Sequence, residues 1–162
     1  MDSRLFDLAV QVGQALKGQG WMLVTAESCT GGWVGEAVTM VSGSSEWFER
    51  GFITYTNVAK QEMLGVKAAT LEANGAVSEP TALEMVAGAL ARSHGHIAVA
   101  VSGVAGPTGG TPAKPVGTVC LAWGIRGVEP TAVTRHYAGD REAVRRQSVV
   151  EVLEGVLKLA RG

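Results

Sequence analysis

The chain has 162 residues, 46% of them hydrophobic and 18% charged, and its formal net charge is -1. Length and composition are typical of one compact domain, so we expect a single domain over residues 1–162. The small net charge excludes a general attraction to nucleic acid or anionic membranes, and no apolar stretch is long enough to span a bilayer, which together indicate a soluble, cytoplasmic protein without such partners.

Hydrophobic periodicity predicts alternating helices and strands over the first hundred residues. Short uninterrupted apolar runs indicate strands that are buried on both faces. Ser3 and Ser78 are the expected N-caps of two of the helices. In chain order, the expected elements are a helix over 5–16, a strand over 21–24, a helix over 32–41, a strand over 48–55, a helix over 58–64, a helix over 79–93 and a strand over 97–101.

The remainder of the chain begins with a loop rich in glycine and proline over residues 103–115, where neither helix nor strand is sustained. Residues 116–123 and 131–137 predict two strands of an antiparallel hairpin, and Asp140 is the expected N-cap of a last helix. Alternating elements followed by a hairpin predict an α/β fold. We expect a layered α/β/α sandwich around a mixed, mostly parallel sheet, with a C-terminal hairpin and a C-terminal helix.

The segment T-A-E-S-C-T-G-G directly follows the first expected strand and precedes a helix. Enzymes with α/β folds place nucleophiles at such junctions, so Ser28 is a candidate nucleophile. Backbone N–H groups near Thr30, Gly31 and Gly32 are the expected donors to an oxyanion. Cys29 is the rival nucleophile, although no histidine lies near it in the sequence. A plain helix cap is the alternative interpretation of the whole segment.

A second strand-to-helix junction supplies a candidate base. Thr56 is positioned to cap the helix, which places Lys60 in the first turn among apolar neighbours. Burial and the positive end of the helix dipole both lower the pKa of a lysine, so Lys60 is able to accept the proton of Ser28. Tyr55 at this junction is a candidate for orienting the amine. The alternatives are a solvated lysine and a tyrosine that points into solvent.

Four motifs, in one order along most of the chain, resemble the CinA C-terminal domain family. They are A-E-S-C-T-G-G at 26–32, G-F-I-T-Y-T-N-V-A-K at 51–60, G-A-V-S-E-P at 75–80 and S-G-V-A-G-P-T-G-G-T-P-A-K-P-V-G-T at 102–118. That family includes stand-alone nicotinamide mononucleotide amidohydrolases, which release ammonia and nicotinate mononucleotide. The resemblance implies a serine nucleophile at Ser28, a lysine at Lys60, a supporting tyrosine at Tyr55, and a homodimer or larger homo-oligomer.

A mononucleotide substrate requires a phosphate site, and the glycine-rich loop is the expected one. Consecutive backbone N–H groups at Gly106, Gly109 and Gly110, with the Thr108 hydroxyl, are suited to an anion. A loop that only covers the edge of the sheet is the alternative. Three arginines near the start of the last helix are further phosphate ligands or a solvated basic face, with Arg145 favoured among Arg141, Arg145 and Arg146.

Two functional hypotheses remain at the level of sequence. One is a Ser-Lys amidohydrolase that requires neither a metal nor an organic cofactor, because the same amine activates the water that releases the acid. The two cysteines, Cys29 and Cys120, match no metal-ligand spacing, in agreement with this. The other is a catalytically inactive module of the same fold that binds a nucleotide-like ligand or mediates assembly. A group of apolar residues is the expected subunit contact: Trp33, Val34, Met40, Trp47 and Phe48.

Overall fold

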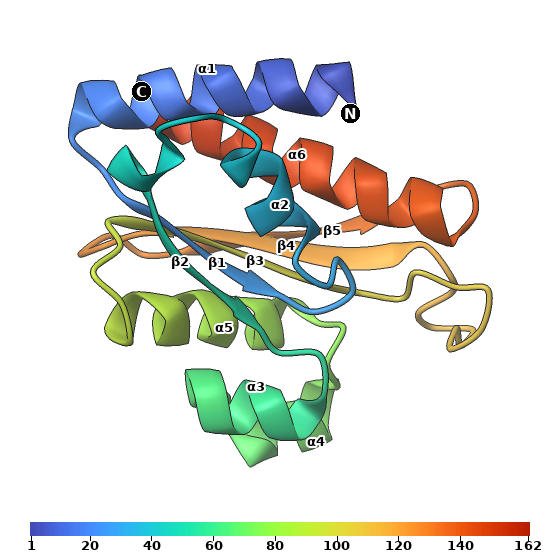
Figure 1. The fold of residues 1–162 in the computed structure, drawn as a ribbon. Helices are drawn as coiled ribbons and strands as arrows, with labels where there is room; N and C mark the ends of the chain where they lie inside the picture. The colour runs from blue at the N-terminus through green and yellow to red at the C-terminus, as the bar shows by residue number, and fades with distance from the viewer.

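A computed structural model describes residues 1–162 as a five-stranded sheet between two layers of helices (Figure 1). The elements in chain order are α1 (Ser3–Gln19), β1 (Leu23–Glu27), α2 (Trp33–Thr39), a single 3₁₀ turn (Ser44–Glu46), β2 (Phe48–Ile53), α3 (Asn57–Leu64), α4 (Ala68–Asn74), α5 (Glu79–Ala91), β3 (Ile97–Gly103), β4 (Thr118–Ile125), β5 (Thr131–His136) and α6 (Arg141–Arg161). Helices α1, α2 and α6 cover one face of the sheet, and α3, α4 and α5 lie on the other. The predicted α/β/α sandwich is therefore confirmed.

The strands follow the order β2-β1-β3-β4-β5 across the sheet. Strand β1 is parallel to both β2 and β3, whereas β4 is antiparallel to β3 and to β5. The sheet is mixed, as expected, with its parallel part confined to β2, β1 and β3. The predicted C-terminal hairpin, formed by β4 and β5, and the C-terminal helix α6 are both present.

Several expected boundaries differ from the structure for local reasons. Strand β1 begins two residues later than expected and continues through the polar residues Thr25 and Glu27, which are buried with the rest of the strand. Asp2, and not Ser3, caps α1, because its carboxylate accepts the N–H of Leu5. Helix α4 was not predicted, since it is short and buries a single residue. The expected caps at the starts of α3, α5 and α6 are confirmed.

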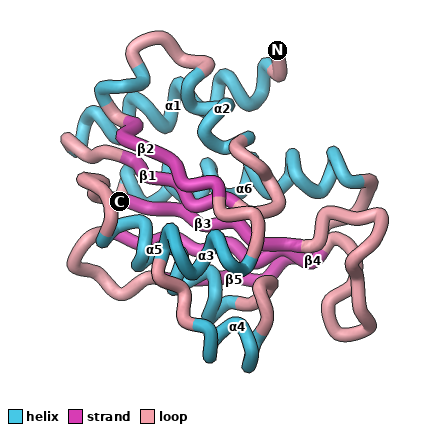
Figure 2. Tube along the Cα trace, turned by 60° about the horizontal axis from the view of Figure 1, so that its bottom comes forward, coloured by secondary structure: helices cyan, strands magenta, loops and turns pink.

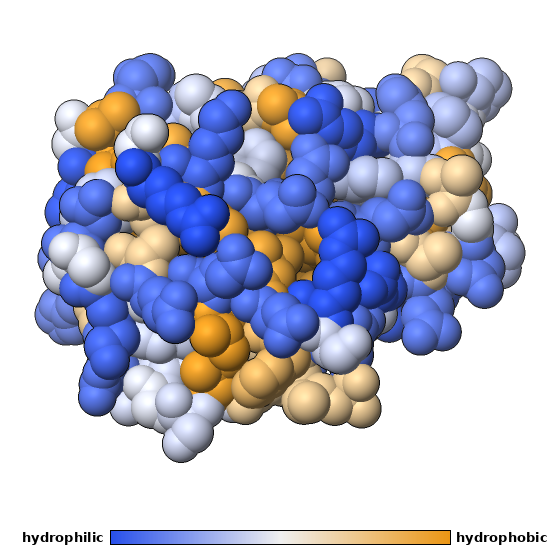
Figure 3. Space-filling view, turned by 90° about the horizontal axis from the view of Figure 1, so that it is seen from above, coloured by the Kyte–Doolittle hydropathy of each residue, from blue (hydrophilic) through white to orange (hydrophobic).

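The larger core lies between the sheet and the layer of α1, α2 and α6. The expected subunit contact belongs largely to this core: Val34 and Trp47 are buried, and the other three residues are half-buried and pack against it. Gly13 on α1 leaves the space that the Trp47 ring occupies. Seen from above, the outer surface of this layer is mostly hydrophilic, with small apolar areas between polar side chains (Figure 3). No helix combines the length and apolar composition required to cross a bilayer.

The arrangement of β1 determines where a ligand site can form. Its two parallel neighbours, β2 and β3, lie on opposite sides of it (Figure 2). The direction in which strands are added to the sheet therefore reverses at β1. The crevice beyond the carboxyl ends of strands at such a reversal is the usual ligand site of open α/β sheets. The residues that follow β1, β2 and β3 therefore meet at one edge.

Candidate active site

Ser28 is the first residue after β1 and lies at the bottom of this crevice. Its N–H donates to the carbonyl of Val101 on β3 at 2.9 Å, which ties the strand end to its neighbour. The residue is 8% exposed. Its hydroxyl oxygen lies 3.3 Å from the carbonyl oxygen of Tyr55 and faces the segment after β2.

Lys60 comes from that second segment and reaches Ser28. Helix α3 is capped by Thr56, whose hydroxyl accepts the N–H of Ala59 at 3.1 Å. This cap places Lys60 at the first turn of α3 and directs its side chain inward, where the residue is 1% exposed. The Lys60 Nζ atom lies 2.9 Å from Ser28 Oγ. The two groups therefore meet, and the solvated-lysine alternative is wrong.

Burial of Lys60 brings the neutral form of its amine within reach near neutral pH. Burial lowers the pKa of its amine from 10.5 to about 8. Nζ donates to the carbonyl oxygens of Thr54 at 2.9 Å and Tyr55 at 3.2 Å. As an ammonium, Nζ also donates to Ser28 Oγ; a neutral amine keeps its two N–H groups on the carbonyls and has a lone pair for the hydroxyl proton of Ser28. The arrangement joins a nucleophile to a base within hydrogen-bond distance.

Cys29 lies beside this pair but differs from it in reactivity. Its thiol is buried, and burial raises its pKa to about 11. The thiolate is the reactive form of cysteine, so this thiol is a poor nucleophile near neutral pH. Cys29 nevertheless lines the pocket together with Ser28.

In the turn between β1 and α2, two of the N–H groups expected to bind an oxyanion donate to other groups of the protein. The carboxylate of Glu27 accepts the Thr30 hydroxyl at 2.7 Å and the Gly32 N–H at 3.2 Å. It also accepts two further N–H groups of the first turn of α2. The Gly31 N–H donates to the carbonyl of Ser28 at 3.0 Å. Gly31 and Gly32 are therefore not free to hold an oxyanion, whereas the N–H groups of Cys29 and Thr30 donate to no other residue. Cys29 lines the Ser28 pocket, and Thr30 is fully buried and is not among the pocket residues.

Ser28 and Lys60 open into a small pocket of about 210 Å³. Eleven residues line it: Ser28, Cys29, Tyr55, Asn57, Lys60, Ala76, Val77, Ser102, Gly103, Ala105 and Arg141. Tyr55 is 56% exposed at the mouth of this pocket, and its hydroxyl accepts from Arg141 Nη2 at 3.1 Å. Tyr55 therefore contacts Lys60 through its backbone carbonyl and not through its phenol.

The three arginines of α6 have separate environments. Arg141 lines the pocket, and its Nη1 donates to the carbonyl of Gly106 at 2.8 Å. Arg145 instead donates to the carbonyl oxygens of Cys29 and Thr30 and is not among the pocket residues. Arg146 pairs with Asp2 at 2.6 Å, away from the site. Of the three arginines, Arg141 lines the Ser28 pocket, whereas the sequence favoured Arg145.

The glycine-rich loop extends beyond the edge of the sheet (Figure 1). Thr108, Gly109 and Gly110 are exposed and line neither the Ser28 pocket nor the groove beside it. The loop closes on itself through Thr111 and Lys114, and the Lys114 ammonium donates to a carbonyl at the end of α4. The N–H groups of Gly109 and Gly110 and the Thr108 hydroxyl make no hydrogen bond within the protein, but they lie outside the Ser28 pocket and the groove beside it.

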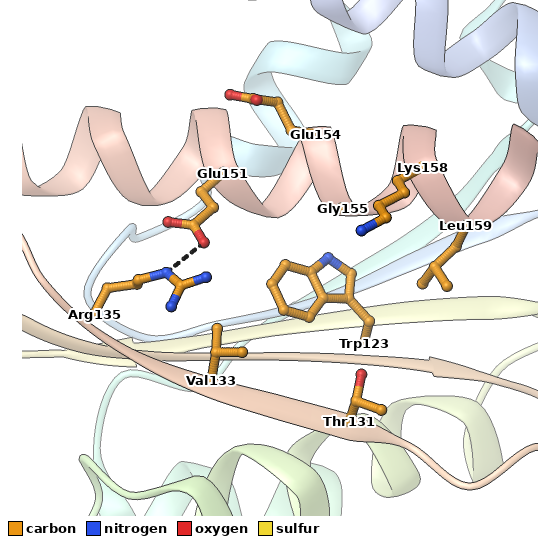
Figure 4. Close-up of a pocket in the computed structure, with 9 residues that line it drawn as sticks. All are labelled: Trp123, Thr131, Val133, Arg135, Glu151, Glu154, Gly155, Lys158 and Leu159. Atoms are coloured by element: carbon orange, nitrogen blue, oxygen red, sulfur yellow. Dashed lines mark hydrogen bonds and ion pairs between the residues drawn. The ribbon is translucent and has the colours of Figure 1, made fainter.

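A shallow groove of about 470 Å³ adjoins the Ser28 pocket and shares Ala105 and Arg141 with it. A different cavity, of about 530 Å³, lies between β5 and α6 with Trp123 beside the helix (Figure 4). An ion pair between Arg135 and Glu151 at 2.7 Å crosses this second cavity, which contains no serine, cysteine or histidine. The groove that contains Arg141 is therefore the space into which a ligand in the Ser28 pocket would extend. No group of three or more histidine, cysteine or acidic side chains is placed to hold a metal ion.

Sequence reasoning missed part of the pocket wall. Ser102 at the end of β3 is 1% exposed, and its hydroxyl donates to the carbonyl of Ala76 at 2.9 Å. Its position was detectable, because a strand expected to lie parallel to β1 ends beside Ser28. Asn57, Ala76 and Val77 carried no comparable signal, since their place depends on how α3, α4 and α5 pack.

Comparisons with known proteins identify one family. A family model for the CinA C-terminal domain matches residues 5–160. Nicotinamide-nucleotide amidohydrolase PncC of Escherichia coli strain K12 is 52% identical over 153 residues, which cover 94% of this chain and 93% of that protein. The protein of the same name from Pseudomonas putida is 53% identical over 152 residues and 94% of each chain.

Solved structures with the same fold include two of high similarity. The competence/damage inducible protein CihA from Agrobacterium tumefaciens superposes with a TM-score of 0.93 at 45% identity, covering 96% of this chain and 94% of that one. A CinA superfamily protein from Klebsiella pneumoniae gives a TM-score of 0.93 at 37% identity, covering 97% and 98% of the two chains. The similarity therefore extends over nearly the whole of each chain.

Proposed function

The chain belongs to the CinA C-terminal domain family, and we propose that it hydrolyses the carboxamide of nicotinamide mononucleotide through an acyl-enzyme on Ser28. The observation that carries this proposal is the 2.9 Å approach of Lys60 Nζ to Ser28 Oγ, with the two N–H groups of a neutral amine already satisfied. The names of the relatives supply the substrate. A serine with an amine base is suited to acyl transfer from an amide.

In the first half of the reaction, Ser28 Oγ attacks the carboxamide carbon while its proton passes to Lys60 Nζ. The carbonyl oxygen of the substrate becomes an oxyanion, which the free N–H groups of Cys29 and Thr30 stabilise. Lys60 then gives the proton to the leaving nitrogen. The C–N bond breaks, ammonia departs, and the acyl group remains on Ser28.

In the second half, a water molecule takes the place of ammonia and loses a proton to neutral Lys60 as it attacks the ester carbon. The bond between Ser28 and the acyl group breaks, and the proton returns to the Ser28 oxygen. The products are nicotinate mononucleotide and ammonia, from one amide and one water.

The substrate extends over two neighbouring spaces in this proposal. The Ser28 pocket alone, at about 210 Å³, is smaller than the range of about 300–1,000 Å³ that is usual for small-molecule sites. The carboxamide ring occupies this pocket, and the ribose phosphate extends into the groove of about 470 Å³. Arg141 lines both spaces and is the phosphate ligand, since a guanidinium binds phosphate oxygens in pairs.

The proposed activity is tested with purified protein and nicotinamide mononucleotide. We expect equal amounts of ammonia and nicotinate mononucleotide, measured by a coupled ammonia assay and by chromatography. A Ser28→Ala sample prepared in parallel gives the background. Ammonia release no greater than that background would contradict the enzymatic function and favour the inactive ligand-binding module.

The pH profile of kcat/KM is expected to follow the Lys60 amine. Only the neutral amine accepts a proton, and its pKa of about 8 makes it the minor form below that pH. The rate should therefore rise about tenfold per pH unit between pH 6.5 and 7.5 and level off above pH 8.5. Measurements start at pH 6.5 because the substrate phosphate titrates near pH 6. A flat profile from pH 6.5 to 9 would exclude Lys60 as the base.

Arg141→Met is expected to weaken substrate binding more than turnover. Hydrogen bonds to a charged group contribute about 1.5–3 kcal/mol, so KM should rise about tenfold to hundredfold while kcat falls less than threefold. Nicotinamide riboside, which lacks the phosphate, should show no such increase. Arg146→Met is the matched control, because Arg146 pairs with Asp2 outside the pocket. An unchanged KM in Arg141→Met would remove Arg141 from the phosphate site.

A further inference from the structure

Arg145 of α6 holds the backbone of the turn that carries Ser28. Its Nε donates to the carbonyl oxygen of Cys29 at 3.0 Å, and its Nη2 donates to that of Thr30 at 3.1 Å. The guanidinium carbon also lies 5.3 Å from the ring centroid of Trp33, the first residue of α2. Three fixed contacts from one side chain leave the guanidinium little freedom, unlike a solvated arginine.

These contacts determine the direction of N–H groups on the opposite side of the turn. In a trans peptide unit, the C=O of one residue and the N–H of the next point in opposite directions. When Arg145 binds the carbonyl of Cys29, the N–H of Thr30 is fixed on the side away from the guanidinium. The orientation of the Thr30 N–H is thus set directly by Arg145.

The second donor is set through one more peptide unit. Arg145 binds the carbonyl of Thr30, which shares a peptide unit with the N–H of Gly31. That N–H donates to the carbonyl of Ser28 at 3.0 Å. The Ser28 carbonyl in turn shares a unit with the N–H of Cys29, a residue of the pocket wall. Two planar units therefore connect the guanidinium to a free N–H beside the nucleophile.

We propose that Arg145 is a positioning residue that fixes the N–H groups of Cys29 and Thr30 as the oxyanion donors of this site. The proposal rests on the proposed amidohydrolase function and adds to it the element that shapes the oxyanion site. Glu27 holds the same turn from its N–H groups, which donate to the Glu27 carboxylate, while the Arg145 guanidinium donates to the carbonyl oxygens. Preorganised donors of this kind stabilise the charge that develops in the transition state.

Arg145→Met and Arg145→Lys test the proposal by two independent measurements. Loss of one oxyanion donor lowers kcat by about 10²–10³-fold in other enzymes, so we expect Arg145→Met to lower kcat about a hundredfold with KM changed less than threefold. Arg145→Lys, which retains one donor for one carbonyl, should lose about tenfold. Amide hydrogen exchange at residues 28–31 should accelerate at least about tenfold in Arg145→Met and remain unchanged in the sheet. Arg146→Met, on the same helix, should leave both measurements unchanged.

The outcomes distinguish this proposal from the proposed function. If wild-type protein releases no ammonia, the function fails, and exchange at residues 28–31 alone decides whether Arg145 holds the turn. A rise in KM with kcat retained in Arg145→Met would assign Arg145 to the phosphate and overturn its positioning role. Unchanged exchange in the turn would overturn it as well. If Arg145→Met does not fold, the tenfold loss of kcat expected for Arg145→Lys becomes the deciding value.

Discussion

Lys60→Met is expected to lower kcat by about 10⁴-fold, the upper range for a group that acts as both base and acid. Lys60 is the basic side chain within hydrogen-bond distance of Ser28 Oγ, and the same amine serves both halves of the proposed reaction. Methionine keeps the length and apolar stem of lysine but accepts no proton. KM should change little, because the amine contacts the nucleophile and two backbone carbonyls and not the phosphate groove.

The same substitution should not destabilise the protein at neutral pH. Burial lowers the pKa of Lys60 from 10.5 to about 8, so the folded state holds its proton less strongly than the unfolded state does. At about 1.4 kcal/mol per pH unit, this difference costs the folded state about 3 kcal/mol below pH 8. The cost disappears as the pH rises from 8 to 10.5, since stability increases where the unfolded state binds more protons. Methionine removes the cost and leaves two carbonyls without a donor, at about 1–3 kcal/mol.

Thermal unfolding and ammonia release together measure these effects. We expect the melting temperature of Lys60→Met to equal or exceed that of wild type at pH 7 and to lose this advantage by pH 10. Lys67→Met is the matched control, because Lys67 is exposed and outside the pocket, and it should retain full activity. Near-normal kcat in a folded Lys60→Met protein would exclude the proposed base.

The meeting of Ser28 and Lys60 was predictable because both follow strands at the same edge of a parallel sheet. The capping hydroxyl of Thr56 also fixed the start of α3 from local sequence alone. Burial of Lys60 was less evident, since lysines on short helices are mostly exposed. It depends on the packing of α3 against α5, a contact between segments far apart in the sequence that no local pattern reports.

The choice among the arginines shows a limit of the same reasoning. Arg141 and Arg145 are four residues apart on α6 and lie on one face, so periodicity places both near the site. Arg145 binds the carbonyl oxygens of the Ser28 turn and is thereby held away from the pocket. The positions of these carbonyls depend on the folded turn and cannot be read from the sequence. Likewise, the glycine-rich loop has the composition of an anion site, but Thr108, Gly109 and Gly110 lie outside the Ser28 pocket, and the Lys114 ammonium donates to the carbonyl of Asn74.

Ser28→Ala is expected to lower kcat by at least about 10⁴-fold, because the acyl-enzyme has no oxygen on which to form. The thiol of Cys29 is not expected to replace it, since burial raises its pKa to about 11 and keeps it protonated. The lost hydroxyl makes hydrogen bonds of about 1 kcal/mol, so the variant should fold. Ser93→Ala, a serine between α5 and β3 and outside the pocket, is the control that should retain full activity.

Rapid quenching of wild-type protein with substrate, followed by mass spectrometry, identifies the residue that attacks. A nicotinate mononucleotide acyl group on the peptide containing Ser28, absent from Ser28→Ala, is the expected result. Because Cys29 lies in the same peptide, fragmentation must place the acyl group on one of the two neighbours. An acyl group on Cys29, or turnover retained in Ser28→Ala, would exclude the serine mechanism. Such a result would also require the buried thiol to lose its proton to Lys60, a change that the raised pKa of Cys29 opposes.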